Sequence, residues 1–476
     1  MAKLDLSKYT IYRFRYILGY TFIGLLLTGL LVFVGFYLPG GLSAIEMTAV
    51  VRSSALSLSD PATLAITNLP YYALQSLILN TFGITIFTIK LPSLILALLS
   101  AIGFILLLRR WFKPNIAVLT SLIAITTGQF LFIAQQGAPG ILYVFWPVAL
   151  LLLGTQITRG KKFRLLWKVL FAITAALSLY TPLSMYPLIA IALATVLHPH
   201  LRNAVRKLSK VRLTAVLIIF LAMLAPLVYG IVINPQLGLT LLGVPAILPV
   251  DLGANLITVL KQYFAFWQPG TTALMTPVFG LGSVILILLG VYRIIRTRET
   301  TRSYLIIIWV VCLAPVLLFN PAFTSVTFVP SMLLLAAGLT SLIGFWYRLF
   351  PLNPYARITG LIPIVILVFA LSFSGLARYV YGYHYSPTQA ALFSKDLALL
   401  PKDTKEMVVS EDEHDFYNSV AKYRDGIKVV AKPTTDTFLA TRDARKNFEG
   451  YKVSRIITNS QSNDADRLYI YKKTDI

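Results

Sequence analysis

Residues 39–91 contain the ionisable side chains of this chain that could do chemistry, two carboxylates and two cations: Glu46, Asp60, Arg52 and Lys90. A carboxylate can take the proton of an attacking hydroxyl group, and fixed cations can stabilise negative charge that develops in a reaction. We interpret Glu46 as the candidate base and Asp60 as a second catalytic candidate. Arg52 and Lys90 are the candidate contacts of a substrate anion.

Five further side chains on the same predicted membrane face are candidate substrate contacts: Asn68, Tyr71, Tyr72, Lys261 and Arg378. The candidates also have structural interpretations, which stay open. Glu46 could pair with Arg52 or stabilise a helix start. Asp60 could begin a turn, and Lys90 could extend toward lipid head groups. Tyrosines are enriched at membrane–water interfaces without any substrate.

The composition is that of a polytopic membrane protein. The 476 residues are 57% hydrophobic and 13% charged, with a mean hydropathy of +0.75, whereas soluble domains are about 25% charged. Residues 1–377 hold 26 Lys and Arg against five Asp and Glu, while residues 378–476 hold 16 against 14. Because the excess basic charge belongs to the apolar part, we interpret it as membrane topology and expect no nucleic-acid partner. A single cysteine excludes an intrachain disulfide.

Apolar runs of the length needed to cross a bilayer, about 20 residues, recur along the first 377 residues. Roughly eleven transmembrane helices result. The predicted spans are Ile17–Leu38, Leu91–Leu108, Ile116–Ile133, Ile141–Ile157, Trp167–Thr181, Leu183–Leu197, Leu213–Ile233, Pro277–Tyr292, Tyr304–Phe319, Phe328–Trp346 and Ile358–Ala377. The first span is expected to remain as an anchor because no small-residue cleavage site follows it.

Basic residues gather at every second connection between these spans. Six alternate connections hold 23 of the 26 Lys and Arg, and the others hold only Arg52, Lys90 and Lys261. The positive-inside rule then predicts a multi-pass protein of the cell membrane, with a cytoplasmic N-terminus and an extracytoplasmic C-terminal region. His198 and His200 fall in one of the cytoplasmic clusters, and we assign them no chemistry.

The outer connections are of a different kind. A first outer loop (39–90) and a second (234–276) are long and partly apolar, and amphipathic stretches such as Leu256–Trp267 are typical of helices that lie along the membrane surface. Residues 1–377 are therefore predicted to form a transmembrane domain whose outer loops roof a cavity.

Residues 378–476 are predicted to form a small extracytoplasmic α/β domain, because short β-rich runs alternate with helical patterns such as Asp412–Tyr423 and Thr435–Phe448. Its acidic run 411–415 looks superficially like a metal cluster. We interpret it as a helix start, because Ser410 and Glu413 have capping-box spacing, and we assign no metal ligand.

A set of short motifs resembles a known family. The motifs are Gly41-Leu42-Ser43 with Glu46, Asn68 to Leu74, Phe82-Gly83, Ile89 to Ser93, Arg109 to Phe112, Leu179 to Ser184, and Phe328 to Leu339. In this order they resemble the C-type (GT-C) membrane glycosyltransferases, in the branch of the protein O-mannosyltransferases and aminoarabinose transferases. The likeness covers roughly residues 17–377.

The resemblance implies an inverting enzyme of the cell envelope that takes a sugar from a polyprenyl-phosphate carrier. Arg52 and Lys90 would then be the contacts of the carrier's phosphate. The acceptor would be a glycan, a lipid or a protein, and membrane lipids would be further partners. In that family an acid of the first outer loop, often from an Asp-Glu pair, acts as base; here the pair reads Ile45-Glu46, and Asn68 replaces a usual His. No cofactor is implied by the motifs, and a divalent metal stays open.

Two other functions stay open. A member of the family that has lost catalysis could still bind a lipid-linked sugar or a partner protein. A transporter or flippase of lipid-linked sugars is a third hypothesis, although the sequence shows neither clear repeats nor an ionisable residue near a span's midpoint, as transporters commonly do.

Overall fold

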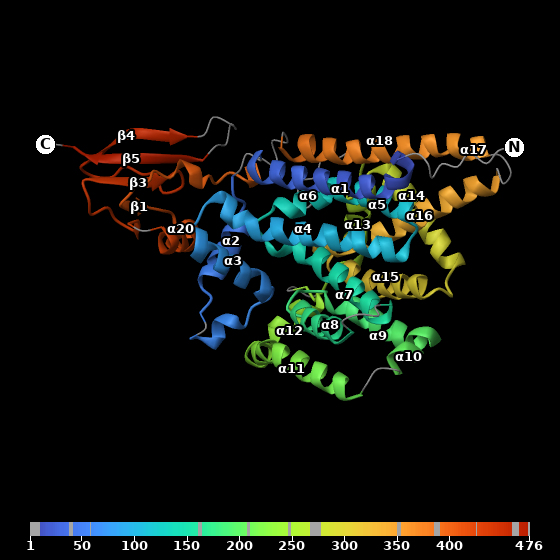
Figure 1. Cartoon of the computed structure of the whole chain (residues 1–476). Helices are drawn as coiled ribbons and strands as arrows, with labels where there is room; N and C mark the ends of the chain where they lie inside the picture. Colours follow the sequence, from blue (N-terminus) through green and yellow to red (C-terminus); the bar gives the residue numbers. More distant parts are fainter. Residues whose placement is uncertain are drawn as a thin grey trace.

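The computed structural model describes residues 10–37, 41–57, 59–159, 164–206, 210–245, 249–266, 278–349, 354–384, 391–424, 426–458 and 466–474. Long helices run side by side through most of the molecule, and a small sheet extends from one end of them (Figure 1). Parts of the two predicted outer loops, residues 38–40 and 267–277, lie outside the described residues.

A helix lies within the described part of each segment that was predicted as a span, but not all of these helices are long enough to cross a bilayer. They are α1 (Thr10–Tyr37), α4 (Ile86–Trp111), α5 (Pro114–Thr126) with α6 (Gly128–Gln135), α7 (Leu142–Arg159), α8 (Arg164–Ser178), α9 (Met185–Leu197), α11 (Lys210–Ile233), α14 (Leu281–Arg296), α15 (Thr301–Phe319), α16 (Phe328–Leu349) and α18 (Leu361–Tyr379). Among the described residues, six helices are long and apolar enough to cross a bilayer. The α5–α6 pair, bent by 56°, makes a seventh if it is counted as one span. The chain is therefore a multi-pass helical membrane protein.

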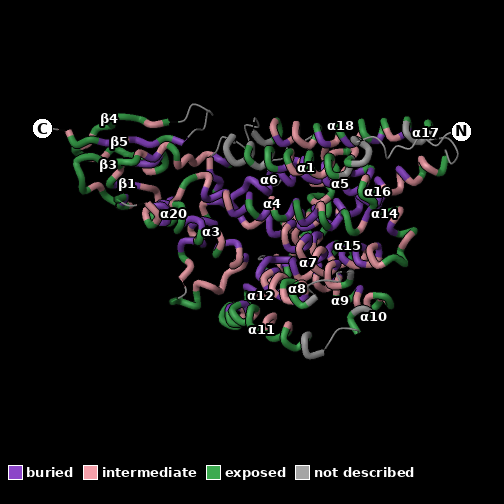
Figure 2. The backbone as a smooth tube through the Cα atoms, viewed as in Figure 1, coloured by how far each residue is buried: buried purple, intermediate pink, exposed green. Residues whose placement is uncertain are grey.

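The core of the bundle lies along α4, α5, α6 and α16, while α11 is exposed along most of its length (Figure 2). Helices α14 and α16 cross closely at two glycines. A Cβ atom at Gly290 would lie 1.9 Å from the carbonyl oxygen of Leu334, and one at Gly338 would lie 2.0 Å from that of Leu286. Small residues at a crossing let helix backbones approach in this way, so any larger residue at either position would separate the pair.

Shorter helices connect the long ones. On the side of the sheet lie α2 (Ala44–Ser54), η2 (Pro61–Leu64) and α3 (Leu69–Phe82). The others are η3 (Pro139–Ile141), α10 (Pro199–Arg206), α12 (Pro235–Leu242), α13 (Leu252–Phe264), η4 (Pro321–Thr327), α17 (Pro354–Thr359), η5 (Val380–His384) and η6 (Leu397–Leu399). The predicted amphipathic segment Leu256–Trp267 corresponds to α13, none of whose residues is buried, and Trp267 itself lies outside the described residues.

The C-terminal sheet has the strand order β2-β1-β3-β5-β4. Its strands are β1 (Glu406–Val408), β2 (Lys428–Val430), β3 (Thr437–Thr441), β4 (Tyr451–Thr458) and β5 (Arg467–Lys473), and α20 (Glu411–Tyr423) connects β1 to β2. Strands β2, β1 and β3 are parallel, whereas β5 is antiparallel to both β3 and β4. The predicted mixture of helix and strand is confirmed.

One predicted helix of this region is wrong. The segment Thr435–Phe448 contains strand β3, which pairs with β1 on one side and β5 on the other. Successive side chains of a strand point to opposite faces. Leu439 is buried on the face that carries α20, while Phe438 and Ala440 are buried on the other. Because both faces of β3 are buried, its consecutive residues Phe438, Leu439 and Ala440 are all apolar, and the polar–apolar alternation that would mark a strand is missing. The burial comes from distant parts of the chain.

The acidic run begins α20, but not through the predicted capping box. The Ser410 side chain does not accept a hydrogen bond from the first helical turn; its hydroxyl instead donates to the Glu413 carboxylate, at 3.2 Å. Glu413 also forms an ion pair with Lys395, which in turn pairs with Asp443 at 2.9 Å. The run therefore ties the helix to the segment that enters the sheet domain.

The sheet domain shares a hydrophobic core with the first outer loop. Leu42, Val50 and Ile89 from the loop and α4 belong to the same buried cluster as Met407 and Phe416 of the sheet domain. Hydrogen bonds accompany this packing between α2 and α20: the Ser54 and Ser419 hydroxyls lie 2.8 Å apart, and the Lys422 ammonium donates to the Ser54 carbonyl at 2.6 Å. The sheet domain thus fixes the position of α2.

A buried carboxylate in β1 gives a first prediction. The Glu406 side chain accepts hydrogen bonds from the backbone N–H groups and hydroxyls of Thr434 and Thr435. Burial alone would raise the pKa of Glu406, but these hydrogen bonds lower it below its usual value. Because hydrogen bonds to a charged group contribute about 1.5–3 kcal/mol, Glu406→Gln is expected to destabilise the sheet by about that much at pH 7.

The pH dependence has a definite sign. The carboxylate's contribution is present above its unfolded pKa of about 4.3 and is lost as the pH falls through the lower folded value. Hydrogen exchange of the strand amides in the full chain would measure the loss of protection at pH 7. Glu411→Gln, at an exposed position of α20, is the control. Equal protection in the two variants at pH 7 would contradict the prediction.

Candidate functional site

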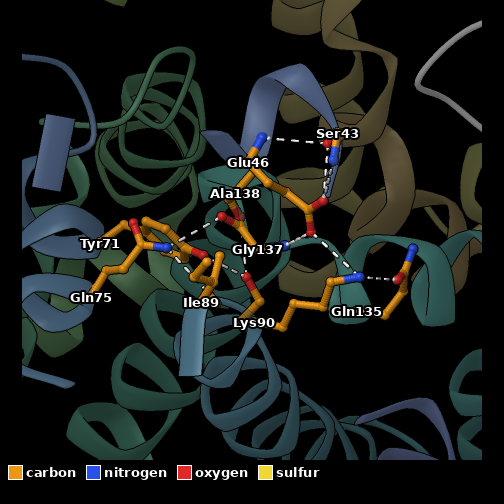
Figure 3. Close-up of polar contacts among 10 residues, drawn as sticks. Ser43, Glu46, Tyr71, Gln75, Ile89, Lys90, Gln135, Gly137 and Ala138 are labelled. Carbon is orange, nitrogen blue, oxygen red and sulfur yellow. Dashed lines mark hydrogen bonds and ion pairs between the residues drawn. The ribbon is translucent and has the colours of Figure 1, made fainter. Parts of the chain in front are cut away.

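The Glu46 carboxylate lies at the first turn of α2 and is fully buried. One oxygen, Oε2, accepts hydrogen bonds from the backbone N–H of Ser43 at 2.8 Å and from the Ser43 hydroxyl at 3.1 Å. The other, Oε1, accepts from the backbone N–H of Gly137 at 2.7 Å (Figure 3). Ser43 and Glu46 form a complete capping box, so the sequence Ser-x-x-Glu both starts α2 and orients the carboxylate.

Lys90 forms an ion pair with the Glu46 carboxylate. Its ammonium lies 3.7 Å from Glu46 Oε1 and 3.5 Å from Gln135 Oε1, and it is 4% exposed (Figure 3). It also lies over the ring of Phe393, 5.6 Å from its centroid, in the segment that leads to the sheet domain. A buried ion pair of this kind is held by α2, α4 and the end of α6 together.

The turn after α6 comes close enough to bind Glu46 because residue 137 is glycine. A Cβ atom there would lie 2.9 Å from Ile89 Cγ2 and 3.3 Å from Glu46 Oε1. The Gln75 amide holds the same turn by donating to the carbonyls of Ile89 at 3.1 Å and Gly137 at 3.4 Å. Any side chain at position 137 would therefore push the turn away from the carboxylate.

Tyr71 extends this network on the other side. Its hydroxyl lies 2.8 Å from the Ser93 hydroxyl, which donates to the carbonyl of Ala138 at 3.2 Å (Figure 3). Burial raises the pKa of Tyr71 well above its ordinary value, with the Glu46 charge adding to the effect. The phenol is therefore a neutral hydrogen-bonding group that helps to position the turn.

Arg52 and Tyr72 form a separate and more accessible pair. Arg52 lies in the last turn of α2 with an exposed side chain, and its Nη1 donates to the Tyr72 hydroxyl at 3.4 Å. Burial raises the pKa of Tyr72, and the nearby Arg52 charge opposes that rise. Arg52 does not pair with Glu46, the alternative that the sequence left open; Lys90 takes that place. The guanidinium is thus available to an anionic ligand.

Asn68 contributes a buried oxygen without a partner. It precedes α3 in the left-handed conformation, with φ of 57°, and its backbone N–H donates to the carbonyl of Tyr180 at 2.7 Å. Its side chain does not cap the helix, and its Oδ1 accepts no hydrogen bond from the described residues. A ligand hydroxyl or ammonium would satisfy it.

The other predicted site residues are neither hydrogen-bonded nor ion-paired to Glu46 or Lys90 in the described part of the chain. Asp60 is exposed and caps η2, with Oδ1 accepting from the N–H of Ala62 at 3.0 Å. Lys261 is exposed in the last turn of α13, and Arg378 is partly buried in the last turn of α18. No interaction within the described residues joins any of these three to the Glu46 carboxylate.

The sequence did not identify four residues that hold the Glu46–Lys90 pair in place as site residues, although Ser43 stands in a family motif: Ser43, Gln75, Gln135 and Gly137. The Ser-x-x-Glu spacing was available as a signal for Ser43. Nothing local marks Gly137 or Gln75, because their role depends on a turn that is distant in the chain. In the described part of the chain, no group of three or more His, Cys, Asp or Glu side chains could hold a metal ion.

Comparison with known proteins gives matches only in structure. No protein-family model matches the sequence, and no curated protein matches it. The fold is similar to that of ArnT from Cupriavidus metallidurans, with a TM-score of 0.51 and 12% identity over 94% of this chain and 97% of that one. The two chains share a fold. ArnT has also been solved with undecaprenyl phosphate bound.

A second similar structure is the oligosaccharyltransferase AglB from Archaeoglobus fulgidus, in complex with an inhibitory peptide and a dolichol-phosphate. Its TM-score is 0.52 at 14% identity, over 87% of this chain and 64% of AglB. The predicted resemblance to GT-C proteins is therefore confirmed at the level of the fold. At 12–14% identity the comparison does not show which residues of this chain bind or react. The roles of the site residues must therefore be inferred from the geometry of this site.

Proposed function

We propose that this protein is a membrane glycosyltransferase that moves a sugar from a polyprenyl-phosphate carrier to an acceptor at the outer face of the membrane. The observation that carries the proposal is a GT-C fold shared over nearly the whole of both chains with ArnT, the sheet domain included. A polyprenyl phosphate is bound in ArnT and a dolichol-phosphate in AglB, which supports a lipid-phosphate donor here.

The proposed topology places the site at the outer face. Eleven spans are proposed from the apolar runs, and the distribution of Lys and Arg then favours a cytoplasmic N-terminus and an extracytoplasmic domain from residue 378. α2, α3 and the sheet domain then lie on the same side of the membrane, which agrees with the core that they share. The first outer loop and the sheet domain would form one wall of the site.

The proposed reaction is a single displacement. The acceptor oxygen attacks the anomeric carbon, the bond from that carbon to the phosphate oxygen breaks with inversion, and the polyprenyl phosphate leaves. Arg52, held by Tyr72, is exposed at the end of α2 and would neutralise the leaving phosphate. Glu46 is the proposed base, and to act it must exchange a hydrogen bond from Ser43 for one from the acceptor hydroxyl.

A second candidate is a protein that binds the carrier lipid without transferring the sugar. The observation that favours it is the state of the Glu46 carboxylate, which is fully buried, with both oxygens occupied by Ser43, Gly137 and Lys90. Both candidates predict carrier binding at Arg52. Only the transferase predicts turnover.

Arg52→Ala tests the binding that both candidates share. We expect about a tenfold weaker apparent affinity for undecaprenyl phosphate, corresponding to roughly 1.4 kcal/mol, because one charge-assisted contact is lost from an accessible site. Binding would be measured on the full chain in lipid nanodiscs. Arg455→Ala, an exposed position of β4, is the control. Equal affinity in the two variants would remove Arg52 from the site.

Turnover would be measured in the same nanodiscs. A panel of undecaprenyl-phosphate-linked hexoses and pentoses would be offered with membrane extract as the acceptor source, and released undecaprenyl phosphate and glycosylated product would be identified by mass spectrometry. Release coupled to product formation is the expected result. Binding without either product would support the second candidate and overturn the first.

A further inference from the structure

A cavity of about 680 Å³ lies at the opposite end of the helices from Glu46. It is bounded by the C-terminal ends of α4, α7 and α9, by α10, and by the N-terminal parts of α8, α11 and α15. Lys90 and Trp111 lie near the two ends of α4, about 30 Å apart at 1.5 Å per residue. The volume falls within the range of about 300–1,000 Å³ that ligand pockets occupy. The cavity is therefore a separate site, on the face predicted to be cytoplasmic.

Most of the cavity wall is apolar. Leu150, Leu151, Ile157, Ile191, Leu213 and Val216 line it. One wall comes from α11, which has only 11% of its span buried inside the protein, so this helix faces the surrounding lipid (Figure 2). A ligand that fits this wall has an apolar chain, which favours a lipid over a soluble metabolite.

The main polar group of the cavity is the Lys168 ammonium. Lys168 is 9% exposed and lines the cavity from the second turn of α8. Within the described ranges its ammonium forms neither a hydrogen bond nor an ion pair. An ammonium that reaches a mostly apolar cavity attracts an anion there more strongly than it would in bulk water.

His198 adds a second polar atom. Its Nε2 lies 3.1 Å from the Glu299 carbonyl oxygen and 3.4 Å from the Thr301 hydroxyl, which fixes the ring against the start of α15. Its buried Nδ1 has no hydrogen-bond partner among the described residues. Because Nε2 faces a carbonyl oxygen it carries the proton, so Nδ1 of the neutral ring is an acceptor, which suits the P–OH of a singly ionised phosphate monoester.

The start of α15 completes a positive rim. The first residues of this 19-residue helix line the cavity, and a helix N-terminus favours anions through its free N–H groups. Arg302 is anchored there by donating to the Trp111 carbonyl at 2.6 Å and by stacking on Phe112. The lining includes one acid, Glu299, which is exposed. Positive potential therefore exceeds negative potential around the cavity.

We propose that this cavity binds an anionic lipid, with its phosphate at Lys168 and His198 and its chains against the aliphatic wall. Basic pockets between transmembrane helices on the cytoplasmic side commonly bind lipid phosphate groups. The phosphate could belong to a glycerophospholipid of the bilayer or to a polyprenyl phosphate. The inference does not depend on the proposed sugar transfer, because it concerns the other end of the bundle.

Native mass spectrometry of the full chain in detergent tests the proposal, with phosphatidic acid as the probe and phosphatidylcholine of the same chains as the comparison. The wild type is expected to retain one phosphatidic acid in preference to phosphatidylcholine. Lys168→Met is expected to weaken that binding about tenfold, because the ammonium is the principal phosphate contact. Arg206→Met, on the exposed side of α10 and outside the lining, is the matched control.

A second variant tests the cavity independently, in case Lys168→Met does not fold. Gly154 lines the cavity, and a Cβ there would make only an ordinary contact with Phe171, at 3.8 Å. Gly154→Phe should fill the cavity and displace the lipid while leaving Lys168 in place. Unfolding temperatures close to that of the wild type would show that both variants fold.

Undecaprenyl phosphate is the second probe and identifies the source of the phosphate. Lys168-dependent binding of phosphatidic acid assigns the site to bilayer phospholipid, and Lys168-dependent binding of undecaprenyl phosphate alone assigns it to a polyprenyl carrier. Binding of undecaprenyl phosphate that depends on Arg52 but not Lys168 belongs to the outer site. Equal retention of every lipid in wild type, Lys168→Met and Gly154→Phe would overturn the proposal.

Discussion

Lys90→Met is expected to destabilise the protein by about 3–5 kcal/mol, because it leaves the Glu46 carboxylate buried without its counter-ion. Glu46→Gln should cost a similar amount by leaving the Lys90 ammonium unpaired in the same place. The double variant should recover most of this loss, since neither buried charge remains. Denaturant unfolding of the full chain in detergent would measure the three free energies as a double-mutant cycle.

The control for this cycle is the Arg52–Tyr72 pair. Arg52 is exposed, so Arg52→Ala should change the free energy of unfolding by less than about 1 kcal/mol. If the double variant loses as much unfolding free energy as the two single variants together, Glu46 and Lys90 do not interact, and the prediction is wrong.

The same variants separate the two proposed functions. A stable Glu46→Gln/Lys90→Met protein that binds the carrier but has lost turnover would support Glu46 as the base. If that protein retains turnover, the carboxylate serves only to hold α2 against the turn at Gly137. If even the wild type shows no turnover, carrier binding without transfer is the better account. Variants of the buried Glu46–Lys90 pair therefore report on both the stability of the fold and the role of Glu46 in the reaction.

The sequence predicted Glu46 and Lys90 as site residues, but it did not predict that they form an ion pair. Each stood out because charged side chains are scarce in the outer connections. Their contact depends on α3, which packs against both α2 and α4, and on Gly137, which lets the turn after α6 approach Glu46. Residues far apart in the chain create this geometry, and no local pattern encodes it.

The helices were more predictable than the sheet domain. A bilayer requires long apolar runs, so hydropathy alone located helices such as α4 and α16. In the sheet domain, β3 was predicted as a helix because Phe438, Leu439 and Ala440 are all buried and show no alternation. A strand between two others has partners on each side that the local sequence does not reveal.

The shared core between the sheet domain and α2 has a functional consequence. Glu46 and Arg52 lie on α2, and α2 is held on one side by the turn at Gly137 and on the other by α20. A substitution inside the sheet domain should therefore destabilise α2, and with it the candidate site, although the substituted residue does not contact the site. Exposed side chains of the edge strand β4 should matter less, because they lie outside the buried cluster that contains Val50 of α2.

Phe416→Ala is the variant that tests this coupling. Phe416 is 3% exposed and packs in the cluster that contains Val50 of α2. Removing a buried aromatic ring costs about 3–5 kcal/mol through the lost contacts and the cavity left behind. We expect faster hydrogen exchange in both the strands and α2 of the full chain, together with weaker binding of undecaprenyl phosphate.

Ile456→Ala is the matched control, since Ile456 is an apolar side chain of the same domain that is 53% exposed. Its exchange and binding should stay at wild-type levels. Faster exchange confined to the strands of Phe416→Ala, with α2 and carrier binding unchanged, would show that the sheet domain does not hold the candidate site. Faster exchange in α2 with weaker binding would instead establish the domain as a support of the outer loop, because α2 is the element through which Phe416 can reach Arg52.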